Sequence, residues 1–259
     1  MCREGKKQSP IAVEKKRALK KNFPAFIFKN YHDVYSTTLK NNGHSAEVRL
    51  KTDKELTVEG GGLPEVYVLD HLHFHWQSEH TVDGYRYPLE LHLVHYRKSF
   101  GNLSHAVQHD KGVAVFSVLY DLSPDDDIEF TSLISLVDKL KESLNQEEKL
   151  ENFYVHDYMP RDTAGFYRYS GSLTTPKCNE GIIWTIFTNT IPISESQART
   201  FHSLKTDEQK ELTKNYRPLQ KINGRNVYLK VSPIHKSSGS SLAMSKYIMF
   251  VILGVVYIH

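Results

Sequence analysis

Apolar and polar residues alternate along several short stretches of this chain, and this alternation predicts β-strands. The clearest of these stretches are 66–69, 89–96, 112–119 and 182–187. A period of two residues is that of a half-buried strand, because successive side chains point to opposite faces of a sheet. Helical periodicity is rarer, and its clearest examples are 132–144 and a shorter stretch at 194–203. The pattern therefore favours an α+β fold dominated by sheet.

Histidines gather in one segment, HLHFHWQSEHTVDGYRYPLELHLVH at 71–95, which holds six of the fourteen in the chain. Within H-x-H-W, the spacing of two places His73 and His75 on the same face of a strand. His92 lies on a second alternating run, and the Asp83-Gly84 pair between the two runs is typical of a hairpin. We therefore predict antiparallel neighbouring strands that bring these three imidazoles together.

Three imidazoles held on rigid strands are the ligand set of a catalytic zinc site, because the fourth position stays open for water. No cluster of cysteine thiolates competes for the ion, so Zn²⁺ is the cofactor that this sequence predicts. A single histidine is more often structural than ligating. We keep that interpretation for His71, His80 and His95 when each is considered alone.

Length and composition indicate one large core. The chain has 259 residues, 39% of them hydrophobic, with no repeat and no linker in its middle. We assign 1–235 to a single domain. The net charge is only +3, and the basic residues of 15–21 are not interleaved with aromatic ones. This stretch is therefore interpreted as a solvated surface, and nucleic acid is not expected as a partner.

Several motifs occur in an order that resembles the α-class carbonic anhydrases over nearly the whole chain. They are Q-S-P-I at 8–11, N-N-G-H at 41–44, H-x-H-W at 73–76, S-E-H-T-V-D-G at 78–84, E-L-H-L-V-H at 90–95, Y-S-G-S-L-T-T-P at 169–176, Ile183-Trp184 and N-Y-R-P at 215–218. The resemblance implies a large, twisted, mainly antiparallel central sheet with short peripheral helices. It also implies a zinc lyase that reversibly hydrates carbon dioxide to bicarbonate and a proton.

The resemblance assigns roles to residues around the three proposed ligands. Thr174 is expected to accept the proton of the zinc-bound hydroxide and to donate its own hydroxyl proton to Glu79. His44 matches the family's proton shuttle, since a histidine that titrates near neutral pH can relay protons. Glu90 shares a strand face with His92 and is expected to fix the tautomer of that ligand.

Further positions are expected to line or support the cavity. An apolar wall for carbon dioxide matches Val94, Val115, Leu173 and Trp184, each of which could equally be plain core. Thr175 and Asn42 are expected on the polar side. Two residues are expected to support the ligands: His71, which stands where the family usually has a glutamine that contacts one of them, and Asn215.

Three departures from the family pattern leave alternatives open. Only Gln77 and Ser78 separate Trp76 from Glu79, where the family usually has a longer loop, and Glu47 replaces a common neutral amide. The third departure is the histidine at 71. The alternatives are a catalytically silent carbonic-anhydrase-like domain for binding or adhesion, or another zinc hydrolase. The absence of H-E-x-x-H weighs against a peptidase.

The cysteines and both ends of the chain bear on location. Cys2 and Cys178 are either two free thiols or, as secreted and membrane-anchored family members imply, a disulfide formed in an oxidising compartment. The sequon at 102–104 is consistent with secretion. Small residues at 237–241 precede an apolar run at 247–258, so we assign 236–259 to a GPI-attachment signal, in preference to a single-pass helix or a dispensable tail.

These features predict an extracellular, membrane-anchored or secreted monomer that acts on a small molecule. Because no apolar signal segment precedes Q-S-P-I, we expect the sequence to lack its true start.

Overall fold

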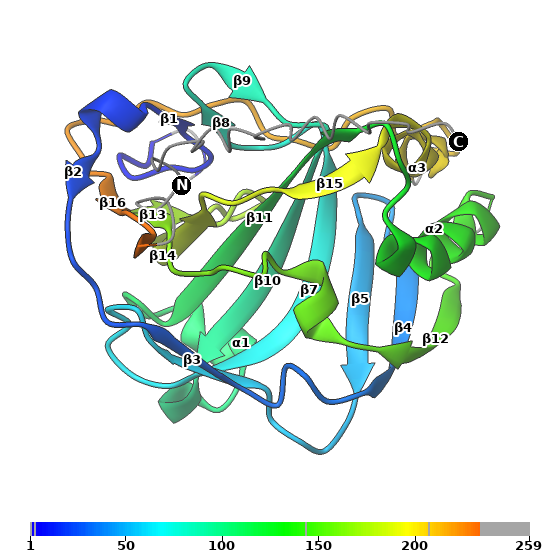
Figure 1. The fold of residues 1–259 in the computed structure, drawn as a ribbon, viewed down its shortest axis with the longest axis horizontal. Coiled ribbons are helices and arrows are strands. Elements are labelled where there is room, and N and C mark those ends of the chain that lie inside the picture. The colour runs from blue at the N-terminus through cyan, green and yellow to red at the C-terminus, as the bar shows by residue number, and fades with distance from the viewer. Residues whose placement is uncertain (1, 3, 143, 207, 234–259) are drawn as a thin grey trace, which may run out of the picture.

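The computed structural model describes residues 2, 4–142, 144–206 and 208–233. These residues form a 13-stranded sheet and a small three-stranded sheet, with short helices around them (Figure 1). The strands are β1 (Ala12–Val13), β2 (Leu19–Lys20), β3 (Phe26–Lys29), β4 (Tyr35–Asn41), β5 (Ala46–Lys51), β6 (Thr57–Gly60), β7 (Tyr67–Trp76), β8 (Thr81–Val82), β9 (Tyr85–Arg86), β10 (Leu89–Arg97), β11 (Val113–Ser123), β12 (Glu147–Phe153), β13 (Phe166–Ser172), β14 (Glu180–Phe187), β15 (Ile191–Ser194) and β16 (Tyr228–Lys230). The α-helices are α1 (Leu103–Ala106), α2 (Ile128–Leu140) and α3 (Glu195–Thr200). The 3₁₀-helices are η1 (Lys15–Arg17), η2 (Lys98–Phe100), η3 (Val155–Tyr158) and η4 (Phe201–Ser203).

The large sheet runs in the order β12-β4-β5-β7-β10-β11-β14-β13-β16-β2, so its centre is β7, β10 and β11. Neighbours are antiparallel from β12 through β11. Strand β11 pairs in parallel with β14 and β15, and β16 with β2. The sheet is thus mixed and mainly antiparallel, and the predicted sheet-dominated α+β class with short helices is confirmed.

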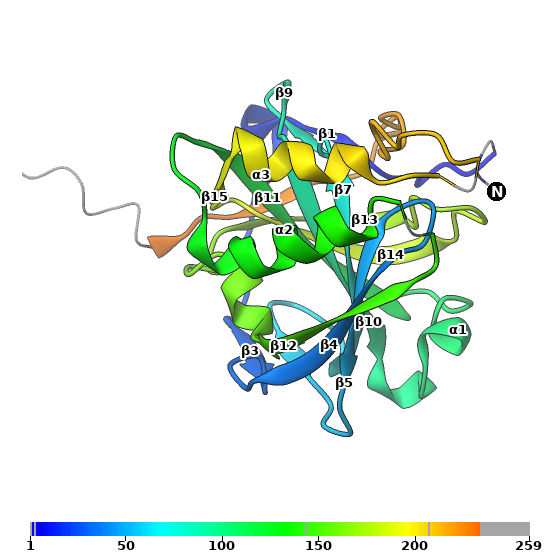
Figure 2. The ribbon, with the colours of Figure 1, turned by 90° about the vertical axis from the view of Figure 1, so that its right-hand side faces the viewer.

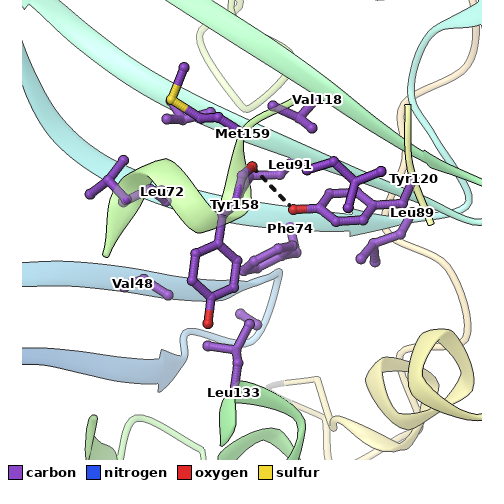
Figure 3. Close-up of a cluster of buried hydrophobic side chains, with 14 of the residues drawn as sticks. Val48, Leu72, Phe74, Leu89, Leu91, Val118, Tyr120, Leu133, Tyr158 and Met159 are labelled. Carbon is purple, nitrogen blue, oxygen red and sulfur yellow. Dashed lines mark hydrogen bonds between the residues drawn. The ribbon is translucent and has the colours of Figure 1, made fainter. Parts of the chain in front are cut away.

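The two faces of the central strands differ in character. On β7, Leu72, Phe74 and Trp76 join the largest apolar cluster, whereas the alternate positions carry histidines. Figure 3 shows this cluster filled by side chains from β7, β10, β11 and α2, with Tyr120 Oη donating to the carbonyl of Tyr158 at 3.3 Å. Strong burial of one face fixes the strand register, and the register in turn fixes which residues reach the other face.

Local caps decide where the helices begin. The side chain of Asp127 accepts a hydrogen bond from Phe130 N, so α2 begins at Ile128, four residues before the range predicted from periodicity, and ends at Leu140. Ser194 and Gln197 form a capping box at the start of α3, and η4 continues it to Ser203, which agrees with the predicted 194–203. Figure 2 shows α2 and α3 side by side.

The predicted hairpin at Asp83-Gly84 is present, but it joins β8 to β9 and not the two histidine strands directly. Asp83 and Gly84 both have positive φ, 48° and 85°, as a two-residue type I′ turn requires. Strands β7 and β10 are still antiparallel neighbours, as predicted.

None of the helices within the described ranges is both long and apolar enough to cross a membrane. The small-residue and apolar stretches of 236–259 lie outside the described residues.

Candidate metal centre

Two neighbouring central strands bring the three proposed ligands together. His73 and His75 lie on β7 and His92 on β10, and His92 is paired directly with His73 across the ladder. Residues paired in this way point to the same face, so the period of two on each strand converges all three rings. Ring centroids are 4.6–5.1 Å apart, and the candidate ligand atoms lie within 4.8 Å of one another.

Hydrogen bonds on the far sides of two rings determine which nitrogens face the centre. His75 Nδ1 donates to the backbone carbonyl of Asn215 at 2.8 Å, and His92 Nε2 donates to Glu90 Oε1 at 2.8 Å. His75 Nε2 and His92 Nδ1 therefore carry lone pairs. His73 Nε2 completes the set, 3.2 Å from His92 Nδ1.

These nitrogens fit a tetrahedral cation. Zinc–nitrogen bonds of about 2.0–2.1 Å place two ligand atoms about 3.3 Å apart, close to the 3.2 Å between His73 and His92. The buried Nε2 of His75 has no hydrogen-bond partner among the described residues. Burial and the neighbouring histidines lower the pKa of His73 well below its usual value, which keeps the ring neutral and able to bind a metal.

Glu90 is a fully buried acceptor that holds one ligand ring. Its Oε1 accepts from His92, from His80 Nδ1 at 2.7 Å and from Ser117 Oγ at 2.6 Å, and its Oε2 accepts from the backbone N–H of His80 at 2.9 Å. Burial raises the pKa of Glu90, but its electrostatic interactions and hydrogen bonds with His80 and His92 outweigh that effect, and the pKa falls well below the usual range. His80, Glu90 and His92 also satisfy a metal-site geometry, but their facing atoms already bond to one another.

Glu79 is buried beside the ligands despite the short connection before it. Gln77 adopts a positive φ of 58°, and the backbone N–H groups of Gln77 and Ser78 donate to Pro88 and Tyr87 at 2.7 Å, so the ladder closes without a longer loop. Glu79 Oε1 accepts from Arg217 N at 2.9 Å. Its Oε2 has no partner within the described part of the chain and lies 3.7 Å from His75 Nε2.

Comparisons with known proteins bear on what this centre is. The model of the eukaryotic-type carbonic anhydrase family matches residues 1–231. The chain belongs to that family. Carbonic anhydrase 12 of Homo sapiens is 32% identical over 84% of this chain and 64% of its own length. Carbonic anhydrase 4 of Oryctolagus cuniculus is 32% identical over 86% of this chain and 75% of its own length. Carbonic anhydrase 15 of Mus musculus is 31% identical over 92% of this chain and 79% of its own length. The predicted family and enzyme class, a carbonate dehydratase, are confirmed.

The residues predicted as the carbonic anhydrase substrate wall lie together beside the ligands. Val94 pairs with Val115, and Val115 pairs with Trp184, across β10, β11 and β14. All three are nearly inaccessible to solvent, and Leu173 packs against their cluster. The Trp184 ring is 4.9 Å from that of His92. Thr175 is exposed.

The predicted bond between Thr174 and Glu79 is not among the hydrogen bonds of the described residues. Thr174 is half-buried in the segment after β13, and Glu79 Oε2 has no hydrogen-bond partner among the described residues. His44 is exposed on the turn after β4, where Asn42 Oδ1 accepts from its backbone N–H at 3.1 Å.

The hydrogen bond predicted from His71 to a ligand histidine is not present among the described residues. His71 Nδ1 is 2.7 Å from Asp70 Oδ2, while its ring stacks on His73 with centroids 5.2 Å apart. The carboxylate of Asp70 therefore takes the hydrogen bond of His71 Nδ1. The buried Nδ1 of His73 has no hydrogen-bond partner among the residues described. Glu47 lies opposite His73 in the ladder and pairs with Arg49 at 2.5 Å.

Asn215 supports the centre in a way that its side chain alone did not suggest. Its backbone carbonyl holds His75, its Oδ1 accepts from Trp76 N at 2.8 Å, and its Nδ2 donates to the carbonyls of Phe74 and His44, both at 2.9 Å. One residue thus fastens the end of β7 on both sides of a ligand.

Arg217 is a functional residue that sequence reasoning missed, although it lies within N-Y-R-P. Its backbone N–H holds Glu79, and its guanidinium donates to the carbonyls of Ser9 at 2.7 Å and Cys2 at 3.0 Å. Cys2 and Cys178 form the predicted disulfide, across 176 residues. The N-terminal segment is therefore bonded covalently to the connection between β13 and β14, and hydrogen-bonded to Arg217, whose backbone also holds Glu79.

Proposed function

We propose that this protein is a zinc-dependent carbonic anhydrase that reversibly hydrates carbon dioxide to bicarbonate. The observation that carries the proposal is the pair His73 Nε2 and His92 Nδ1, 3.2 Å apart, with His75 Nε2 left unpartnered beside them. A zinc ion held there would lower the pKa of a bound water to about 7, the value characteristic of carbonic anhydrases, and so supply hydroxide at neutral pH.

The protein's own groups would orient the attacking oxygen. The Thr174 hydroxyl would donate to Glu79 Oε2, because a carboxylate can only accept and this oxygen is open. The Thr174 oxygen is then available to accept a hydrogen bond from the attacking hydroxide, which directs a lone pair of the hydroxide at the substrate. Arg217 N keeps the other carboxylate oxygen occupied, so the direction of the relay is fixed.

The remaining roles follow from polarity and exposure. The apolar surface formed by Val94, Val115, Leu173 and Trp184 offers carbon dioxide a place without competing hydrogen bonds. His44 is exposed, and a group that passes protons to buffer must be accessible to solvent.

Zinc content and turnover should be measured together to test this function. His92→Ala should lose both the bound zinc and stopped-flow hydration activity. His44→Ala, the matched control, should keep its zinc and lose rate mainly in weak buffer. Hydration at the background rate by the wild-type protein with one zinc bound would overturn the proposal. An unchanged rate of His44→Ala in weak buffer would remove the shuttle role alone.

We also propose an extracellular location, with the protein a monomer attached to the membrane through 236–259. The Cys2–Cys178 disulfide supports an oxidising compartment, and the side chain of Asn102, in the sequon, is exposed. Release from expressing cells by a phosphatidylinositol-specific phospholipase is the expected result. Retention after that treatment would contradict the GPI anchor and leave a single-pass segment.

A further inference from the structure

Two further histidines, His105 and His109, lie at and just after α1. Figure 2 shows α1 apart from α2 and α3. His105 lies on α1 and His109 on the turn that follows it, and both side chains are exposed. Their Nε2 atoms are 3.3 Å apart. The spacing of four residues places both rings on one side of the helical turn.

Phe100 positions both of these imidazoles. His105 Nδ1 donates to the backbone carbonyl of Phe100 at 3.1 Å, which leaves His105 Nε2 as a bare lone pair. The His109 ring stacks on the Phe100 ring, with centroids 4.3 Å apart and planes within 5°. The two nitrogens therefore face each other from rings whose orientations are already fixed.

The separation of these nitrogens is that of two ligands on one tetrahedral ion. It is nearly the 3.2 Å found between His73 Nε2 and His92 Nδ1 in the metal centre, and about 3.3 Å is expected for two zinc–nitrogen bonds of about 2.0–2.1 Å. Imidazole nitrogens prefer divalent transition metals such as Zn²⁺ and Cu²⁺.

We propose that His105 and His109 form a second, solvent-exposed site for a divalent transition-metal ion, with water completing the coordination. Without metal, the pair shares one hydrogen bond, from His109 Nε2–H to His105 Nε2. When the ion binds, that proton leaves for solvent or for His109 Nδ1, and each Nε2 donates its lone pair to the metal. With two protein ligands instead of three, this ion should exchange more readily than the one in the buried centre.

This site is independent of the proposed reaction, because neither histidine touches Glu79, Thr174 or the three central ligands. Binding should be measured by titrating Zn²⁺, in a buffer that does not chelate it, into the full chain with its central zinc in place. We expect one additional ion per chain. His105→Ala and His109→Ala should each abolish it, while both variants keep the carbon dioxide hydration rate of the wild type.

Gln108→Ala is the matched control, since Gln108 lies between the two histidines and also contributes a bond to α1, Nε2 to the carbonyl of Ser104 at 3.1 Å. It should retain the additional ion. A Cu²⁺ complex of the wild type should show two nitrogen couplings in electron paramagnetic resonance, and the single variants fewer. The proposal is overturned if the wild type takes up no additional ion, or if the His105→Ala/His109→Ala double variant binds it equally well.

Discussion

The backbone carbonyl of Asn215 accepts a hydrogen bond from His75 Nδ1 at 2.8 Å, across 140 residues of sequence. The same residue also fastens Phe74 and Trp76, the two neighbours of that ligand on β7. A loop far along the chain therefore determines the orientation of an imidazole that a strand supplies, and changes in that loop should be felt at the metal.

Asn215→Ala should weaken zinc retention. The carbonyl remains, but without the side chain its position is no longer fixed, and groups that orient a ligand typically contribute about 10–100-fold to metal affinity. The rate of zinc transfer to a chelator measures the effect. Asn226→Ala, which removes an exposed amide with one 3.4 Å bond to Tyr228 Oη, is the control and should release zinc as the wild type does. Equal release by the two variants would contradict this role of Asn215.

Glu79→Gln should keep the metal and lose turnover. The amide matches the carboxylate in shape but presents a donor as well as an acceptor, so it no longer fixes the direction of the relay with Thr174. Hydration should fall by roughly 10²-fold or more at unchanged zinc content. The exposed Glu195→Gln removes a surface ion pair with Arg199 and should change neither quantity. A Glu79→Gln variant with wild-type turnover would show that the buried carboxylate orients nothing.

His95 should make folding sensitive to acid. Burial lowers its pKa from 6.5 to about 3, with Nδ1 donating to the carbonyl of Leu93 and Nε2 beside Tyr31 Oη. Between these pH values the unfolded chain binds a proton that the folded chain does not. Stability therefore falls as the pH drops from 6.5 to 3, by up to about 5 kcal/mol from this group alone.

Denaturant unfolding from pH 7 to pH 4 checks this prediction. His95→Gln removes the titrating group and keeps a polar partner for Tyr31, so its free energy of unfolding should depend less steeply on pH than that of the wild type. Parallel pH profiles would assign the acid sensitivity to other groups. The depressed pKa of Glu90 affects stability only at lower pH, because its contribution to the free energy of unfolding is lost only as the pH falls below the usual carboxyl range.

Arg168 should contribute by its volume and not by its charge. Only 7% of the residue is exposed, it lies against the rings of Phe23, Phe26 and Phe166, and its Nη2 has no partner among the described residues. Burial lowers its pKa to about 10, so it stays charged at neutral pH. Arg168→Met should leave the free energy of unfolding within about 1 kcal/mol of the wild type. The substitution removes the favourable contacts between the cation and the rings, but it also removes the unfavourable desolvation of the buried cation, and the two effects offset each other.

Arg168→Ala is the counterpart, and it should lower the free energy of unfolding by about 2–4 kcal/mol because it leaves a cavity between the rings. Thermal or urea unfolding of the two variants separates packing from charge. A methionine variant as unstable as the alanine variant would show instead that the guanidinium itself holds this part of the core.

Alternation along β7 and β10 was enough to predict the central geometry. It placed His73, His75 and His92 on one face, and the register confirms that these strands are neighbours. The start of α2 was predicted wrongly, because the apolar period marks the buried face of a helix and not its first turn. Asp127 caps that turn before the periodic run begins.

Contacts that depend on nearby polar side chains were beyond sequence reasoning. Asp70 captures His71 Nδ1, and nothing in the alternation of β7 distinguishes that outcome from a contact with His73. Arg217 reaches Glu79 through its backbone N–H, which any non-proline residue at that position would offer. The motif showed that the position matters, but only the tertiary structure shows what it touches.

Because His73 pairs directly with His92, binding of the proposed metal would depend on the alignment of β7 with β10. A slip of one residue between β7 and β10 would turn the imidazoles into the apolar core and Leu72 and Phe74 outwards, while a slip of two would separate the ligands along the ladder. Only one alignment of β7 with β10 both buries Leu72 and Phe74 and brings the ligand nitrogens of the three histidines together. A chain with these two strands misaligned would therefore lack the metal, so zinc content would report on the alignment of β7 with β10.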